Sequence, residues 1–538
     1  MSTRKRLSTL FLTFLTAGTA LAGPYEVYFS PNGGFAPMNQ ERNLQLANGK
    51  EVTATIGDSL YKMIDEAEEF GQIKICLYAM GDMNAVDRLV AAARDRRIKV
   101  KLILDGCADW TQDIRRGIYS KIIAAREECK AKGLSFDFQL AETKKKHMIH
   151  RHRTRRLDDG KYIYGTNHEK FGVFYRKGEH VPFDSFCGSA NASYASSGVF
   201  AENRCYFFDR PGIARQFQEE FARLWNEWAD CVDGDCESEM YVEADPIPGE
   251  VKVIFNSEPV DEDSYYRIDE ELDRTIQKVR WREGSLDLAM FSITHRGLCE
   301  QVINQAIQKP ESKFRILLDQ SMMMSTDTHI GVMGPWFEEQ VEKHGLKNLE
   351  VRYKWRSTAY GYDEDEKRIQ LVHWRSLLLH HKLLIVNGSI LECGSYNWSS
   401  SAEMRNLENL MVFNRSYRHQ GEVIDRFQAE YNTIWDALKP EGEVAAPIRG
   451  VPQTVSGPYG RKLATRIIEL LNDEKYLALV KTLYGAGPSD DPFKTAEKIG
   501  KESGQTGEEL NSRLADLVQA TLLCKLDRDG KTGYTLAD

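Results

Sequence analysis

The chain has 538 residues, of which 42% are hydrophobic and 28% are charged, and its formal net charge is −9. A chain of this length exceeds one ordinary hydrophobic core, so we expect a soluble globular protein of two to four domains. The negative balance excludes a surface that is basic throughout, so any site for anions must be a local basic patch.

Residues 1–22 predict a signal peptide. Three basic residues at positions 4–6 precede the apolar run LSTLFLTFLTAGT, and residues 20–22 supply the small side chains of a cleavage site. A membrane anchor is the alternative, but the run is short and rich in threonine, which favours cleavage. We therefore expect export to the periplasm or the extracellular space, with no transmembrane segment in the mature chain.

Export makes the ten cysteines candidates for disulfides. Cys231 and Cys236 are spaced to close a small loop, and Cys107 with Cys129 is a weaker pairing. Two further cysteines lie in apolar, strand-like runs and are expected to be buried thiols: Cys187 and Cys393. No cysteine or histidine spacing fits a zinc site, so we predict no metal site.

The chain then repeats itself in the order of its predicted elements. A short strand at 25–34 has a counterpart at 251–259. The run 73–80, a helix and the strand 100–105 match the run 286–293, a helix and the strand 314–319. A strand, a helix and a strand at this spacing predict a βαβ unit with a parallel strand pair.

The repeat continues in the same order through four more pairs of segments. The matched pairs are 167–175 with 379–387, 186–191 with 392–397, 201–208 with 407–413, and 217–225 with 427–435. The sequence therefore predicts one α/β unit present twice. We place the two domains at residues 23–245 and 246–438, joined near ADPIPGE (244–250).

A stretch containing proline and glycine, 439–458, predicts a linker to a third region at 459–538. This region is expected to be helical and to end in two short strands around Asp529 and Gly530. Helices followed by a hairpin resemble a winged helix, a unit that binds DNA or proteins or serves as a structural cap. The sequence leaves these roles open.

Each half contains His-x-Lys, as His168 with Lys170 and His380 with Lys382. Residues two apart on a strand point to the same side, so each histidine should project together with its lysine. The neighbouring His381 should point the other way and serve a structural purpose.

Each half also supplies a serine, an asparagine and a glutamate after its His-x-Lys: Ser189, Asn191 and Glu202, and Ser395, Asn397 and Glu408. Lysine and asparagine from both halves would surround a phosphate with hydrogen bonds, and we also assign both serines to substrate binding. A glutamate could hold its histidine in one orientation. Two facing histidines suit covalent phosphodiester chemistry, in which the lysines neutralise charge without a metal or cofactor.

At these residues the chain resembles the phospholipase D superfamily, whose signature is H-x-K-x(4)-D in two copies, each followed by Gly-Ser-x-Asn. The resemblance covers about residues 25 to 437. It implies two α-β-α sandwich domains with one pseudo-twofold active site between them, and a phosphohistidine intermediate. It assigns His168 as the nucleophile and His380 as the general acid and base, with the reverse left open. Because both half-sites lie in one chain, we expect a monomer.

Two departures from the signature stand at Tyr175 and Asn387, where the family has aspartate. That aspartate is mainly structural in the family, so the departures do not exclude catalysis. They leave room for a degenerate protein that only binds phosphate.

A basic run, KKKHMIHRHRTRR, precedes the first His-x-Lys. It predicts contact with a polyanion, either nucleic acid or an anionic lipid surface. We assign five of its residues to substrate binding: Lys144, Lys145, Lys146, Arg151 and Arg153. The functional hypotheses are therefore an exported enzyme of the phospholipase D type that hydrolyses or transfers a phospholipid phosphodiester, an exported nuclease, or a phosphate-binding protein.

Overall fold

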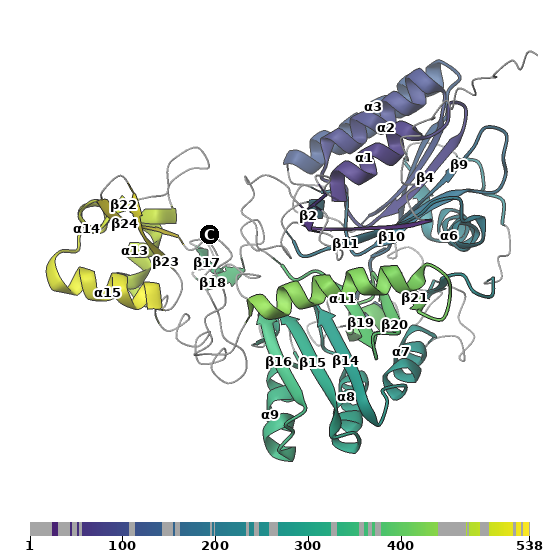
Figure 1. Cartoon of the computed structure of the whole chain (residues 1–538). Coiled ribbons are helices and arrows are strands. Elements are labelled where there is room, and N and C mark those ends of the chain that lie inside the picture. The colour runs from purple at the N-terminus through teal and green to yellow at the C-terminus, as the bar shows by residue number, and fades with distance from the viewer. Residues whose placement is uncertain are drawn as a thin grey trace, which may run out of the picture.

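The structure is a computed structural model of the chain (Figure 1). It describes residues 24–30, 44–45, 51–52, 56–106, 113–141, 154–156, 162–193, 196–197, 200–232, 236–241, 247–257, 267–323, 331–354, 360–363, 368–371, 378–438, 470, 473–484, 494–519, 523–528 and 531–536.

The first half is built on an eight-stranded mixed sheet with the order β1-β11-β10-β9-β4-β5-β6-β12. Its strands are β1 (Tyr25–Phe29), β4 (Gln72–Leu77), β5 (Lys99–Asp105), β6 (Phe136–Ala141), β9 (Lys170–Tyr175), β10 (Asp184–Gly188), β11 (Asn203–Phe207) and β12 (Ala229–Cys231). Strands β4, β5 and β6 are parallel, which confirms the first βαβ prediction.

The helices of this half are α1 (Ile56–Glu66), α2 (Met83–Arg96), α3 (Asp113–Ala131) and α6 (Pro211–Arg223), which continues into η2 (Leu224–Trp228). Helix α2 begins where the Asp82 carboxylate accepts hydrogen bonds from the backbone N–H groups of Asn84 and Ala85. This half also contains two short two-stranded sheets. In one, β2 (Leu44–Gln45) pairs with β3 (Glu51–Val52); in the other, β7 (Thr154–Arg156) pairs with β8 (Tyr162–Tyr164).

The second half repeats this strand order in a seven-stranded sheet, β13-β21-β20-β19-β14-β15-β16. Its strands are β13 (Lys252–Phe255), β14 (Arg282–Met290), β15 (Glu311–Asp319), β16 (Leu349–Lys354), β19 (Lys382–Val386), β20 (Ile390–Gly394) and β21 (Asn409–Asn414). Its helices are α7 (Arg267–Gln277), α8 (Arg296–Gln308), η3 (Gln320–Met323), α9 (Gly334–His344), α10 (Ser400–Met404) and α11 (Gln420–Ala437), and β17 (Tyr360–Asp363) pairs with β18 (Arg368–Leu371). The predicted duplication is confirmed.

The two halves pack through one helix from each, and α11 lies between the two sheets in Figure 1. Helix α6 packs on β9 and β10 of its own sheet and on β13 of the other, and α11 packs on β21 and on β1. Matching ring contacts join the halves: Phe217 to Phe255 at 5.9 Å and Phe427 to Phe29 at 5.0 Å between centroids. This exchange gives the halves one continuous apolar core.

The C-terminal region follows the order of a winged helix. Its elements are α13 (Glu474–Tyr484), β22 (Lys494–Thr495), α14 (Ala496–Ser503), α15 (Gly507–Gln519), β23 (Leu523–Arg528) and β24 (Lys531–Leu536). The strands form a sheet in the order β22-β24-β23, with β23 and β24 as the predicted hairpin.

The disulfide prediction for Cys231 and Cys236 is confirmed. The weaker pairing is wrong, because Cys129 is a free buried thiol; Cys107 lies outside the described residues. Cys187 and Cys393 are buried free thiols, as expected.

Several predictions fall outside the described residues. These are the signal peptide, residues 244–246 of the predicted joint at 244–250, and the linker. Export therefore stays a prediction.

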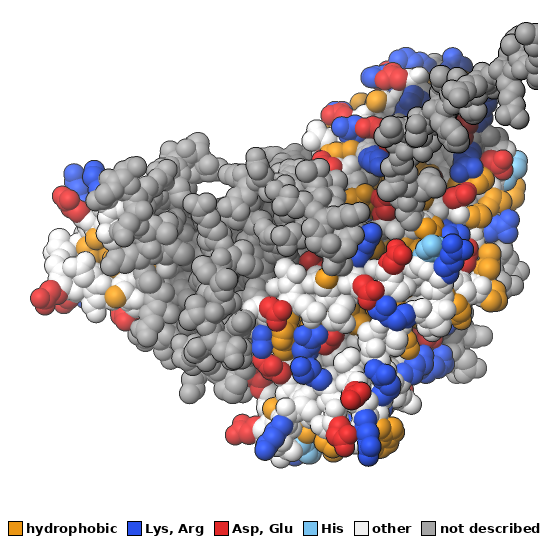
Figure 2. Space-filling model, viewed as in Figure 1, with side chains coloured by type: hydrophobic (Ala, Val, Ile, Leu, Met, Phe, Trp, Pro, Cys, Tyr) orange, Lys and Arg blue, Asp and Glu red, His pale blue; other side chains and the backbone are white. Residues whose placement is uncertain are grey.

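Within the described residues, no helix combines the length and apolar character needed to cross a membrane. On the face seen in Figure 2, the coloured basic and acidic side chains are interspersed.

Candidate active site

Backbone hydrogen bonds between the halves bring the two His-x-Lys segments to one place. The His168 N–H donates to the Leu407 carbonyl at 2.9 Å, and the His380 N–H donates to the Ala201 carbonyl at 2.9 Å. Because Leu407 precedes Glu408 and Ala201 precedes Glu202, each bond places a glutamate of one half beside the histidine of the other.

The histidines are accordingly oriented across the halves. Nδ1 of His168 lies 2.9 Å from Glu408 Oε2, and Nδ1 of His380 lies 2.9 Å from Glu202 Oε2. Because an ionised carboxylate only accepts, the hydrogen bond to Glu408 places a proton on Nδ1 of His168 and leaves the Nε2 lone pair of that ring free. The ring centroids are 6.5 Å apart. The sequence motifs did not show that this pairing crosses between the halves.

The two pairs differ in electrostatics. Burial raises the pKa of Glu202 to about 7. Burial acts the same way on Glu408, but His168, Lys170 and a hydrogen bond from Ser395 outweigh it, so the Glu408 pKa is lowered. The Glu408 pair also has hydrogen-bond geometry, which the Glu202 pair lacks at the same separation. An ionised, hydrogen-bonded partner makes His168 the better nucleophile.

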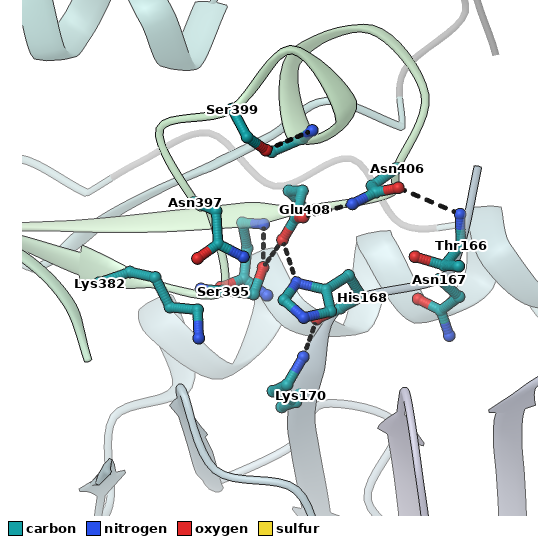
Figure 3. A network of polar contacts seen from close by, with 12 residues as sticks. Thr166, Asn167, His168, Lys170, Lys382, Ser395, Asn397, Ser399, Asn406 and Glu408 are labelled. Atoms are coloured by element: carbon teal, nitrogen blue, oxygen red, sulfur yellow. Dashed lines mark hydrogen bonds and ion pairs between the residues drawn. The ribbon is translucent and has the colours of Figure 1, made fainter. Parts of the chain in front are cut away.

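Each lysine lies beside its histidine, as the strand pattern predicted, and Figure 3 shows this for Lys170 and His168. Lys170 Nζ donates to the carbonyl oxygen of His168, and Lys382 Nζ donates to that of His380 at 2.7 Å. Both side chains are buried, and burial lowers the pKa of Lys170 to about 8 and that of Lys382 to about 7. Burial also lowers the pKa of both histidines, so both rings are neutral near pH 7 before substrate binds.

The two asparagines occupy matching places. The Oδ1 atoms of Asn191 and Asn397 accept from the backbone N–H groups of Ala79 and Ser292, each at 3.3 Å. Fixing the oxygen in this way leaves the amide nitrogen as the end that can donate to a phosphate oxygen.

The two serines lie next to the strands that begin just after the glutamates. Ser395 Oγ donates to Glu408 Oε2 at 2.6 Å and accepts from the Asn409 N–H at 2.9 Å (Figure 3). Ser189 Oγ accepts from the Asn203 N–H at 3.0 Å, and its proximity to Glu202 offsets part of the rise that burial causes in the Glu202 pKa. Both serines are fully buried. Ser395 thus helps to hold Glu408 in place, and the assignment of both serines to substrate binding stays a prediction.

The glycine before each of these serines allows a close approach of two strands. A Cβ atom on Gly188 would lie 2.3 Å from the Asn203 carbonyl oxygen, and one on Gly394 would lie 2.4 Å from that of Asn409. Any side chain there would separate the serine from the glutamate it supports.

Two aspartates support the site although the sequence analysis did not assign them a role. Asp105 Oδ2 accepts from the Asn167 N–H at 2.6 Å, and Asp319 Oδ2 accepts from the Leu379 N–H at 2.9 Å. Each bond fixes the residue before a histidine. The aspartates end the matched strands VKLILD and FRILLD, so the internal repeat already contained this signal.

The histidine next to His380 has the structural place expected for it. His381 is fully buried, with Nδ1 2.9 Å from Asn203 Nδ2 and Nε2 3.3 Å from Glu430 Oε1. It belongs to the interface between the halves, away from the reacting rings.

The first departure from the family signature has a structural reason. Tyr175 is buried at the far end of β9, and the Lys74 ammonium lies 4.7 Å from its ring centroid. Lys74 also pairs with Glu239 at 2.6 Å. An aromatic ring and a paired lysine fill the place that a carboxylate would take.

The second departure caps a turn. Asn387 has φ 54°, a conformation that asparagine tolerates well. Its Oδ1 accepts from the N–H groups of Arg280 and Ser285, each at 3.2 Å, and its Nδ2 donates to the Lys278 carbonyl at 2.8 Å. Both departures lie five residues beyond the lysine, at the end of the strand away from the histidines.

The predicted substrate residues of the basic run are not placed. Lys144, Lys145, Lys146, Arg151 and Arg153 lie outside the described residues, so their assignment stays a prediction. In the part of the chain that the structure describes, no group of three or more histidine, cysteine, aspartate or glutamate side chains could hold a metal ion.

A family model described as "Cardiolipin synthase, PLD-like domain" matches residues 60–225 and 272–435, which is more than half of the chain. The chain belongs to the phospholipase D-like family. One matched segment lies in each half of this phospholipase D-like chain and contains most strands of the sheet in that half.

Among curated relatives, the mitochondrial cardiolipin hydrolase of Danio rerio is 23% identical over 167 residues, which is 31% of this chain and 58% of that protein. The human mitochondrial cardiolipin hydrolase is 24% identical over 169 residues, 31% of this chain and 52% of that protein. This phospholipase D-like chain thus spans little more than half the length of these relatives.

Two solved structures are also similar to the chain. Phosphatidylserine synthase of Haemophilus influenzae aligns over 76% of this chain and 88% of its own, with 11% identity and a TM-score of 0.46. The phospholipase D family member Nuc of Salmonella typhimurium aligns over 35% of this chain and 93% of its own, with 16% identity and a TM-score of 0.23.

The lowered lysine pKa values predict an alkaline limit to activity. Lys382, with a pKa of about 7, and Lys170, with a pKa of about 8, are charged below these values and neutral above them. We expect kcat/KM, which reports groups of the free enzyme, to fall as pH rises from 7 to 9. Lys382→Arg stays charged over this range and should move the limb to higher pH. If the alkaline fall in kcat/KM occurs at the same pH in Lys382→Arg, loss of the Lys382 charge is not its cause.

Proposed function

We propose that the chain is an exported phosphodiesterase of the phospholipase D type that acts on a phospholipid through a phosphohistidine intermediate. The observation that carries this is the pair of imidazoles 6.5 Å apart, each with its Nδ1 2.9 Å from a glutamate of the other half and each beside a buried lysine. Phospholipid is preferred because the matching family model and the curated relatives are named for cardiolipin.

In the first step, Nε2 of His168 attacks phosphorus and the bond from phosphorus to the leaving oxygen breaks. His380 gives its Nε2 proton to that oxygen; the bound phosphodiester anion favours the protonated form that this step needs. Lys170 and Lys382, with the amide nitrogens of Asn191 and Asn397, stabilise the charge on the other phosphoryl oxygens.

In the second step, His380 takes a proton from water, and the resulting nucleophile displaces His168 from phosphorus. An alcohol in place of water gives transfer, so the same site supports hydrolysis and exchange. The ionised Glu408 stabilises the positive charge that His168 carries as a phosphohistidine.

Vesicles and DNA separate the candidate substrates. Purified protein in EDTA should release phosphatidic acid from vesicles that contain cardiolipin, phosphatidylglycerol or phosphatidylcholine, and leave plasmid DNA and single-stranded DNA intact. Cleavage of DNA alone would replace the proposal with a nuclease. Failure to cleave lipid, DNA and bis(p-nitrophenyl) phosphate would leave only a phosphate-binding protein.

A nuclease is the second candidate because of the winged-helix order of α13, β22, α14, α15, β23 and β24. Such units place a helix against nucleic acid in many proteins. Export is tested separately, since a cleaved signal peptide gives a mature chain that begins at Gly23.

A further inference from the structure

Aromatic rings stand beside both histidines, and backbone bonds fix their positions. The Tyr78 ring lies 5.5 Å from the His168 ring, and the Phe291 ring lies 4.8 Å from the His380 ring. The Tyr78 N–H donates to the Glu169 carbonyl, and the Phe291 N–H donates to the His381 carbonyl, each at 3.1 Å. The two rings therefore occupy equivalent places in the two halves.

The surroundings of the two histidines are otherwise unequal. A second ring, Phe200, lies 6.2 Å from the His380 ring. The equivalent position of the other half is Asn406, whose Nδ2 donates to Glu408 Oε1 at 3.0 Å (Figure 3). Among the described residues, His380 thus has two phenylalanine rings beside it. His168 has the Tyr78 ring beside it, and the position equivalent to Phe200 holds an asparagine, not an aromatic ring.

This asymmetry bears on the leaving group. In a displacement by His168, the leaving oxygen departs on the side opposite the attack, next to His380. The group bonded to that oxygen then lies against Phe291 and Phe200. Both rings are partly exposed, so each has a face that a ligand can cover.

A positively charged group is disfavoured in the same place. Lys382 Nζ already lies 5.2 Å from the Phe291 ring centroid. The carboxylates paired with the histidines, Glu202 and Glu408, are fully buried. Their attraction already acts on Lys382, so a cation beside Phe291 would meet an ammonium group that competes with it for these carboxylates.

We propose that Phe291 and Phe200 form the leaving-group subsite and select an alcohol that is uncharged and presents an apolar or planar face. This inference rests on the proposed function, including the assignment of His168 as the nucleophile. By reversal of the first step, an acceptor alcohol that attacks the phosphohistidine occupies the same subsite.

The test measures how the phosphoenzyme divides between acceptors. With bis(p-nitrophenyl) phosphate as donor, release of p-nitrophenol reports formation of the intermediate, and mass spectrometry measures transfer to each alcohol relative to hydrolysis. The acceptors are benzyl alcohol, choline, and 3,3-dimethylbutan-1-ol, which is the uncharged isostere of choline. We expect both neutral alcohols to exceed choline by at least about tenfold.

The variants locate the preference. Phe291→Leu and Phe200→Leu should each lower transfer to benzyl alcohol, relative to hydrolysis, by about 3- to 10-fold. Tyr78→Leu is the matched control at the equivalent position and should leave this ratio unchanged, whatever its effect on turnover.

The outcomes are distinguishable. The subsite is contradicted if transfer to choline equals transfer to its isostere. It is also contradicted if the ratio of benzyl alcohol transfer to hydrolysis is unchanged in both phenylalanine variants. Neither result contradicts the proposed phosphodiesterase activity. If the ratio of benzyl alcohol transfer to hydrolysis falls in Tyr78→Leu and not in the phenylalanine variants, the leaving group lies beside His168. The proposed subsite is then wrong, and His380 is the nucleophile. Absence of p-nitrophenol release overturns the proposed function and the subsite together.

Discussion

His168→Ala should lower kcat by at least about 10³-fold, because it removes the atom that forms the bond to phosphorus. Its Nδ1 hydrogen bond to Glu408 and its position beside Lys170 leave Nε2 as the reacting nitrogen. The measurement is turnover of bis(p-nitrophenyl) phosphate, with a thermal unfolding curve to show that the variant is folded. The variant should also form no covalent phosphoenzyme.

His380→Ala is the matched control for this prediction. Since p-nitrophenol leaves without help from an acid, the variant should complete the first step and release a burst of product. The water step then lacks its base, so the adduct on His168 accumulates and is visible by mass spectrometry. If His168→Ala instead retains turnover and carries the phosphoryl group on His380, our assignment of the two histidines is reversed.

The second large effect is expected at Glu408. Glu408→Gln removes the charge that faces His168 across the two halves and should lower kcat by about 10²- to 10⁴-fold, by analogy with loss of the carboxylate behind a catalytic histidine. Because the Glu408 pKa is lowered, this carboxyl stays ionised at neutral pH. The penalty should therefore be nearly the same from pH 6 to pH 8.

Glu202→Gln supplies the comparison. With a pKa of about 7, Glu202 is mostly protonated at pH 6 and mostly ionised at pH 8. Glutamine resembles the protonated form, so this variant should lose little activity at pH 6 and progressively more as pH rises. The ratio of wild-type to variant kcat across pH measures this. A flat ratio for Glu202→Gln with a sloping one for Glu408→Gln would show that we have assigned the charged pair to the wrong histidine.

The departures from the family signature at Tyr175 and Asn387 show what the local sequence pattern can predict and what it cannot. The sequence correctly located both, but their meaning depended on neighbours distant in the chain. Lys74 and Glu239 surround Tyr175, and the turn between α7 and β14 needs the Asn387 amide. With both explained by local structure, neither supports a degenerate site.

The sequence by itself determined the duplicated α/β unit, the parallel strand pairs and the association of each His-x-Lys with a strand. These depend on hydrophobic period and on residues near one another in the chain, which a single sequence records directly. The orientation of His381 away from the site followed in the same way, since side chains alternate along a strand.

The tertiary structure alone decided which groups complete the site. His168 and Glu408 are 240 residues apart, and they meet because the Leu407 carbonyl accepts from the His168 backbone across the halves. The repeat predicts equal halves, yet Phe200 lies beside His380, while Asn406 at the equivalent position donates to Glu408. Contacts between segments so far apart leave no periodic trace in the sequence, so packing of the halves decides both the cross-pairing and the asymmetry.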